Sequence, residues 1–144
     1  MKWLLDTNVL SELIKPQPDE RVVRWLQSNS QMDYALSVLT FGEIEKGIAM
    51  LQPGVRRVDL AHWARTEIPR QFLGRVLSID TTVAIAWGAL AARSQSNGRP
   101  LPVIDGLILA TAQISNLALV TRNTADCAER GVPVYDPWHD MTYA

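Results

Sequence analysis

The chain has 144 residues, of which 47% are hydrophobic and 20% are charged. This size and composition are typical of one globular domain, residues 1–144, with a single hydrophobic core. The formal net charge of −1 excludes the strongly basic balance of a general nucleic-acid-binding protein. It leaves open an enzyme acting on nucleic acid, because a carboxylate-rich metal site would itself lower the net charge.

The compartment we expect for this chain is the reducing cytoplasm. Its one cysteine, Cys127, cannot form an internal disulfide. No apolar run approaches the roughly 18 residues of a membrane helix, and Asp6 interrupts the apolar start too early for a signal peptide. We therefore expect no membrane partner.

Short apolar runs alternate with stretches of helical periodicity along the whole chain. In chain order, we expect a strand over 3–5, a helix over 7–14, a helix capped by Asp19, a strand over 34–38, a helix opened by Thr40 and a helix over 56–72 that Pro69 bends or ends. The second half adds a strand over 75–79, a long helix that begins after Asp80 and ends at Gly98, a helix over 106–115, and strands over 117–120 and 132–135, with 136–144 as a tail. This alternation indicates an α/β fold with three layers, in which a mostly parallel sheet lies between helices.

Acidic side chains stand where several of these elements begin or end. Asp6 follows the first strand, Glu43 lies in the first turn of a helix, and Asp105 lies at the start of an otherwise uncharged helix. Asn123 and Asp126 follow the fourth strand. Ligands bind at the carboxyl ends of parallel strands, so we expect these five residues to gather at one edge of the sheet.

Each of these acids also has an ordinary structural role open to it. Asp6 can cap the helix that follows, Thr40 and Glu43 match a capping box, and Asp126 can cap a short turn. Asp105 can favour its helix through the helix dipole. For each residue alone the two roles stay open, but carboxylates gathered at one edge would repel unless a cation neutralised them.

The chemistry of such a cluster points to a hard metal ion. Carboxylate oxygens and water are the ligands that Mg²⁺ and Mn²⁺ prefer. The sequence has no CxxC or HExxH pattern, no phosphate-binding glycine loop, no GxSxG and only two histidines, so zinc sites and nucleophilic hydrolases are not indicated. Metal-assisted phosphodiester hydrolysis uses groups that the chain does contain.

Four segments in order carry a family resemblance. They are residues 4–12 (LLDTNVLSE), 40–47 (TFGEIEKG), 103–112 (VIDGLILATA) and 121–126 (TRNTAD), and the end of the chain adds 136–140 (DPWHD). Together they resemble the PIN-domain ribonucleases, and among these the VapC and FitB toxins of bacterial type II toxin–antitoxin modules. The resemblance spans nearly the whole chain and implies a PIN-like fold.

Carried over by position, the resemblance implies that Asp6, Glu43 and Asp105 are acidic metal-site residues. FitB-like proteins tend to have an aspartate where this chain has Asn123, whereas many VapC proteins pair an asparagine there with an aspartate three residues on. Asp126 fits the second pattern. Which of Asn123 and Asp126 contacts the metal directly therefore stays open.

Roles are also expected for residues outside this acidic set. The resemblance makes Asn8 and Thr121 groups that orient carboxylates or waters. Glu45 should point elsewhere on its helix and be a surface charge. Basic side chains that could contact RNA are Lys46, Arg93, Arg99 and Arg122.

The implied function is a Mg²⁺- or Mn²⁺-dependent endoribonuclease toxin, neutralised by a cognate antitoxin, in which water activated by the metal hydrolyses an RNA phosphodiester. A second hypothesis is an antitoxin-binding module of an operator-DNA-binding complex with little or no nuclease activity, which touches DNA only through the antitoxin.

A homodimer or a larger assembly with the antitoxin is also implied, and Trp63 or Trp138 could serve such contacts. A weaker alternative, a phosphatase of the haloacid-dehalogenase type, typically needs an aspartate where this chain has Asn8.

Overall fold

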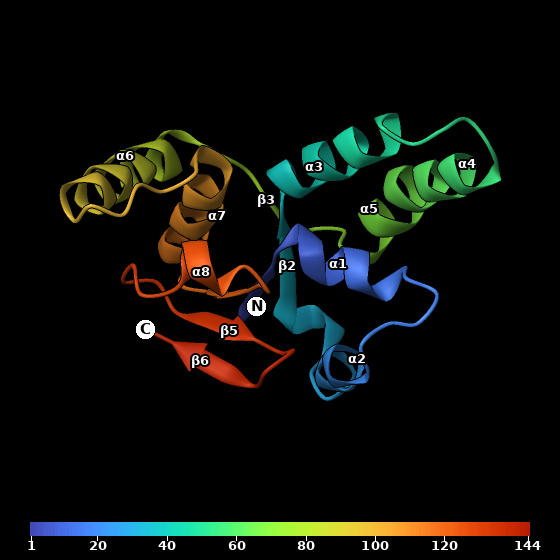
Figure 1. Ribbon diagram of the computed structural model, residues 1–144, viewed down its shortest axis with the longest axis horizontal. Coiled ribbons are helices and arrows are strands. Elements are labelled where there is room, and N and C mark those ends of the chain that lie inside the picture. Colours follow the sequence, from blue (N-terminus) through green and yellow to red (C-terminus); the bar gives the residue numbers. More distant parts are fainter.

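A six-stranded sheet forms the centre of the fold, in the order β3-β2-β1-β4-β5-β6 (Figure 1). The computed structural model describes residues 1–144. The strands are β1 (Trp3–Leu5), β2 (Tyr34–Ser37), β3 (Val76–Leu77), β4 (Ala118–Val120), β5 (Val134–Asp136) and β6 (Met141–Tyr143). The first five pair in parallel, and β6 is antiparallel to β5. The five predicted strands and the mostly parallel sheet are confirmed.

Helices cover both faces of this sheet. They are α1 (Thr7–Leu13), α2 (Glu20–Gln27), the 3₁₀ turn η1 (Gln31–Asp33), α3 (Val38–Ala49), α4 (Val55–His62), the π-helical turn η2 (Trp63–Glu67), α5 (Ile68–Gln71), α6 (Thr81–Ser96), α7 (Val103–Ile114) and α8 (Thr124–Cys127). Figure 1 shows α6, α7 and α8 on one side of the sheet and α1 to α5 on the other, which is the predicted three-layer arrangement. None of the helices is both long and apolar enough to cross a membrane.

Neighbouring residues of the central strands enter different cores, because successive side chains of a strand point to opposite faces of the sheet. Leu5 of β1 and Val120 of β4 pack in the core beneath α1, α3 and α5. Leu4 and Leu119 pack in the core beneath α6 and α7. Burial on both faces is typical of parallel strands, and it leaves the carboxyl edge of the sheet as the place for ligands.

Two predicted helix starts are confirmed by capping hydrogen bonds. The side chains of Asp19 and Asp80 each accept a backbone N–H of the helix that follows, both at 2.9 Å. These caps satisfy donors that have no partner inside the helix. The predicted irregularity at Pro69 is the π-helical turn η2, which directly precedes α5. Proline has no N–H to donate to the regular ladder, so a local change of helix type is expected there.

The capping box considered for Thr40 and Glu43 is not formed. The helix α3 begins earlier, at Val38, and its cap is Ser37, whose hydroxyl accepts the N–H of Leu39 at 3.1 Å. The buried hydroxyl of Thr40 has no hydrogen-bond partner. Glu43 therefore lies beyond the first turn, where its carboxylate has no capping role and is exposed.

Two further boundaries differ from the prediction. The helix α7 begins at Val103 rather than Gly106, so Asp105 is in its first turn. Residues 136–144 do not form a simple tail, because β6 pairs with β5 as an antiparallel hairpin. This edge strand is only three residues long, which is too short for an apolar period to indicate it.

The buried carboxylate of Glu12 fastens the hairpin to the rest of the fold. Its Oε1 accepts the indole N–H of Trp138 at 3.2 Å and the ammonium of Lys15 at 3.0 Å, and its Oε2 accepts the N–H of Asp19 at 3.0 Å. Trp138 is only 2% exposed, so the suggestion that it serves partner contacts is wrong. Trp63 is half-buried against the core beneath α1.

The close contact between α6 and α7 gives a stability prediction. A Cβ atom at Gly106 would lie 2.9 Å from Cδ1 of Trp87 and 3.1 Å from Cδ2 of Leu101. We expect Gly106→Ala to lower the free energy of unfolding by about 1–3 kcal/mol through overpacking. Gly88→Ala is the matched control, because nothing lies within 4 Å of its Cβ position, and it should stabilise α6 by roughly 0.5–1 kcal/mol. Urea unfolding measures both, and equal effects would contradict the close contact.

Glu12 gives a prediction for the dependence of stability on pH. Burial opposes its ionisation, but hydrogen bonds from Lys15, Asp19 and Trp138 outweigh burial and lower the pKa of Glu12 below its ordinary value of 4.5. Its contribution is complete above that value and is lost as the pH falls through the lower pKa of the folded state. The difference in Tm between the wild type and Glu12→Gln should shrink as the pH falls from 7 to about 3. A difference that does not change with pH would contradict this linkage.

Candidate active site

Asp6 lies at the carboxyl end of β1, between β2 and β4, and is 6% exposed. Its Oδ1 accepts the N–H of Thr7 at 2.8 Å, so the helix-capping role considered from the sequence is real. Its Oδ2 accepts the hydroxyl of Thr121 at 2.7 Å and the amide of Asn8 at 3.4 Å. A carboxylate oxygen has two lone pairs, so these contacts leave room for a cation.

The charge of Asp6 is costly in the folded protein. The pKa of Asp6 is raised to about 6, mainly by burial and also by the negative charges of Glu43 and Asp105, against the opposing hydrogen bonds from Thr121 and Thr7. An acid whose pKa is raised by folding destabilises the fold as the pH rises past its unfolded value. A cation near Asp6 would offset that cost.

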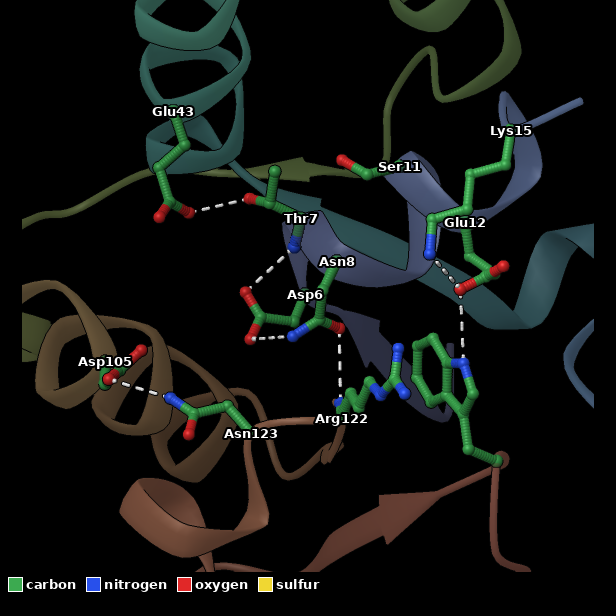
Figure 2. A pocket seen from close by; sticks show the side chains of 11 residues that line it. Asp6, Thr7, Asn8, Ser11, Glu12, Lys15, Glu43, Asp105, Arg122 and Asn123 are labelled. Carbon is green, nitrogen blue, oxygen red and sulfur yellow. Dashed lines mark hydrogen bonds and ion pairs between the residues drawn. The ribbon is translucent and has the colours of Figure 1, made fainter. Parts of the chain in front are cut away.

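Glu43 reaches the same pocket from α3. The hydroxyl of Thr7 donates to its Oε1 at 2.6 Å. The backbone N–H of Thr7 thus contacts Asp6 and the hydroxyl of Thr7 contacts Glu43, so Thr7 connects the two carboxylates (Figure 2). The sequence reasoning missed Thr7, although its place directly after Asp6 puts it at the start of α1.

Asp105 enters from α7 and is half-buried. Burial raises the pKa of Asp105, and the charges of Asp126 and Glu43 add to this effect, while Arg130 and the amide of Asn123 oppose it. The amide of Asn123 donates to Asp105 at 3.2 Å and to Asp126 at 3.2 Å. One neutral amide therefore separates two carboxylates that would otherwise repel.

Asn123 and Asp126 occupy different positions relative to the pocket. Asn123 lines it, whereas Asp126 is absent from the lining and reaches it only through the Asn123 amide. Asn123 is also held by its backbone N–H, which donates to the hydroxyl of Thr121 at 3.0 Å.

Asn8 and Thr121 lie where supporting groups were predicted. Thr121 is fully buried, and its hydroxyl contacts both Asp6 and the amide of Asn8, the latter at 3.0 Å. The Oδ1 of Asn8 accepts the N–H of Arg122 at 3.2 Å. These bonds join α1 to the segment after β4 and fix the orientation of Asp6.

The basic residues suggested for RNA contact lie in different environments. Arg122 lines the pocket, and Lys46 and Arg93 are exposed. Arg99 instead donates to the carbonyls of Ala125 and Ala128, each at 2.6 Å. Its guanidinium therefore holds the segment that carries Asn123, which makes it a poor candidate for RNA contact.

Other predicted side chains lie outside the pocket. Glu45 pairs with Arg65 on the protein surface, with atoms 2.7 and 2.9 Å apart, as expected for a surface charge. Cys127 is completely buried, and burial raises the pKa of its thiol far above the ordinary value. Such a thiol is inert.

Asp6, Glu43, Asp105 and Asn123 line one open pocket of about 390 Å³. No three acidic, histidine or cysteine side chains of the chain are close enough together to form a ready-made metal cage. The donor set nevertheless fits Mg²⁺ or Mn²⁺, because Mg²⁺ needs only one or two carboxylates and keeps several waters. Burial and the neighbouring carboxylates raise the pKa of Asp6 and of Asp105, so a cation beside them would favour their charged forms.

Comparison with known proteins agrees with this geometry. Residues 3–128 match the model of the PIN domain. The chain is 39% identical over 137 residues to Toxin FitB of Neisseria gonorrhoeae, a match that covers 95% of this chain and 99% of that relative. It is 32% identical over 135 residues to VapC ribonuclease Y4jK of Sinorhizobium fredii, covering 94% and 96% of the two chains.

A solved structure of FitAB bound to an IR36 DNA fragment has a chain of the same fold. The TM-score is 0.90 and the sequence identity 37%, over 95% of this chain and 96% of that one. The predicted resemblance and the predicted fold are thereby confirmed. The chain belongs to the PIN-domain family, among relatives of the FitB and VapC toxins.

Proposed function

We propose that this protein is the toxin of a toxin–antitoxin pair and acts as a Mg²⁺- or Mn²⁺-dependent endoribonuclease. One observation carries the proposal. Asp6, Glu43 and Asp105 come from three separate elements and line one pocket at the carboxyl edge of the sheet (Figure 2). The relative named a VapC ribonuclease supports the same chemistry.

In this proposal Asp6, Glu43 and Asp105 hold the ion, one or two of them directly and the rest through its waters, and Asn123 also lines the pocket. Thr7 and Thr121 fix the rotamer of Asp6, and Thr7 also holds Glu43, so the two carboxylates are placed before a ligand arrives. A bound divalent cation supplies an activated water and neutralises charge on the attacked phosphate. Asn123 keeps Asp105 and Asp126 apart through its amide.

We propose further that the chain works with an antitoxin, and contacts DNA only through it. The support is a similar chain in the structure of FitAB bound to a DNA fragment. The net charge of −1 supports indirect contact with DNA, because direct DNA binding depends on a basic surface. If the purified chain bound its antitoxin tightly yet showed no metal-dependent cleavage, the binding-module alternative would replace the enzyme.

The enzymatic proposal predicts a specific pattern among three acid-to-amide variants. Asp6→Asn and Glu43→Gln should each slow RNA cleavage in Mg²⁺ by at least about 100-fold, more than the loss of a merely supporting group. Glu45→Gln is the matched control, because this carboxylate is on α3 with Glu43 but pairs with Arg65 outside the pocket. EDTA should stop cleavage by the wild type, and added Mg²⁺ should restore it.

Cleavage is measured on a labelled RNA by gel electrophoresis. A wild-type rate that EDTA leaves unchanged would exclude the metal mechanism. Equal losses in the Glu43→Gln and Glu45→Gln proteins would show that a change of charge on α3, rather than the pocket, controls the rate.

The positions of Asn123 and Asp126 give a second prediction. Asp105→Ala should abolish Mg²⁺ binding measured by calorimetry, because Asp105 lines the pocket. Asp126→Ala should weaken that binding by only about 10–100-fold, the usual effect of removing a group that orients a ligand. Complete loss in Asp126→Ala would instead assign direct metal contact to Asp126.

A further inference from the structure

The pocket that holds the acidic residues has a second end with different chemistry. Figure 2 shows Glu43, Asp6 and Asp105 toward one side, and Glu12 and Lys15 toward the other, with the guanidinium of Arg122 on the side of Glu12. All of these side chains line the same pocket. A ligand that fills the pocket therefore meets both ends.

Arg122 supplies the uncompensated positive charge of this pocket. Its guanidinium makes no hydrogen bond or ion pair within the protein; only its backbone N–H does, to Asn8. The other cation of the pocket, Lys15, is paired with Glu12 at 3.0 Å. The donors of Arg122 are thus free for an external anion.

The position of Arg122 is nevertheless restrained. Its guanidinium carbon lies 5.5 Å from the centroid of the Trp138 ring, within the range of a cation–π contact. The ring is fixed in turn, because its N–H donates to Glu12 and the backbone N–H of Trp138 donates to Asp136 at 2.8 Å. A guanidinium placed over a ring keeps its edge donors available for bidentate contact with a phosphate.

We propose that Arg122 binds a phosphate of single-stranded RNA, the one adjacent to the scissile phosphate. This inference rests on the proposed ribonuclease function. Every nucleotide of a strand carries a phosphate, so a strand with one phosphate at the acidic end presents the next along the pocket. The hydrogen bond from Arg122 to Asn8 ties this anchor to the group that contacts Asp6. Arg122 therefore sets where along the strand the cut falls and how tightly the strand is held.

The test compares Arg122→Ala with Arg70→Ala. Arg70 on α5 is exposed, makes no ion pair and lies outside the pocket, so its removal changes the net charge equally. With a mixed-sequence oligoribonucleotide and Mg²⁺, Arg122→Ala should raise KM by about 10–100-fold and change kcat less, as expected for loss of a charged contact. Arg122→Lys, which keeps the charge but not the fork, should fall between, and Arg70→Ala should match the wild type.

Binding is measured separately from cleavage by fluorescence anisotropy in a Glu43→Gln background. Removing one phosphate contact should lower the slope of log affinity against log salt by about 0.7 for a single strand. An Arg122→Ala protein with unchanged KM and salt slope, or with the same losses as Arg70→Ala, would overturn the proposal. If Arg122→Ala unfolds, Arg122→Lys and Arg122→Gln decide by the same readouts.

Two outcomes separate this proposal from its alternatives. If the wild type fails to cleave any RNA, the ribonuclease function fails, while the anisotropy still reports whether Arg122 binds a strand. If Arg122→Ala loses affinity for poly-glutamate but not for RNA, Arg122 belongs to a protein interface and the proposal is overturned.

Discussion

The arrangement of the site depends on a carboxylate buried at the end of the central strand. Asp6 is almost inaccessible to water, yet its two oxygens accept three hydrogen bonds from Thr7, Thr121 and Asn8. These bonds favour the charged form but do not cancel the cost of burial, which is why the pKa of Asp6 stays raised. The fold thus maintains a group whose charge is poorly satisfied by the protein alone.

The neighbouring acids extend this imbalance. Glu43 and Asp105 face Asp6 from α3 and α7, and both add to the rise of its pKa. The hydrogen bonds that relieve part of this repulsion come from neutral donors, the hydroxyl of Thr7 and the amide of Asn123, while the charge of Arg130 also lowers the pKa of Asp105. Arg122 and Lys15 are held at the other end of the pocket, by Trp138 and Glu12. The acidic end is therefore left for a cation and the opposite end for an anion.

Much of this arrangement could be predicted from the sequence, because it follows from periodicity. Short apolar runs indicated the parallel strands. The ends of two strands placed Asp6 and Asn123 at one edge of the sheet, and a helix start placed Asp105 there. The start of α3 was misjudged because Ser37 and Thr40 are both good capping residues, and only tertiary packing shows that Thr40 is buried. The contacts of Thr7, Arg99 and Arg122 join residues distant in sequence, and no local pattern encodes them. The strand β6 was missed because three residues are too few for an apolar period to be recognised.

The central position of β1 has a consequence for how the protein is made. Its neighbour β4 lies more than a hundred residues later, and the bond from Thr121 to Asp6 spans 115 residues. During synthesis, Asp6 leaves the ribosome long before Thr121, Asn123 or Trp138 exist. The pocket is therefore assembled only when residues 118–138 have emerged, since contacts of such long range form late. A pocket built this way does not exist until the segment from Asp6 to Trp138 has been translated.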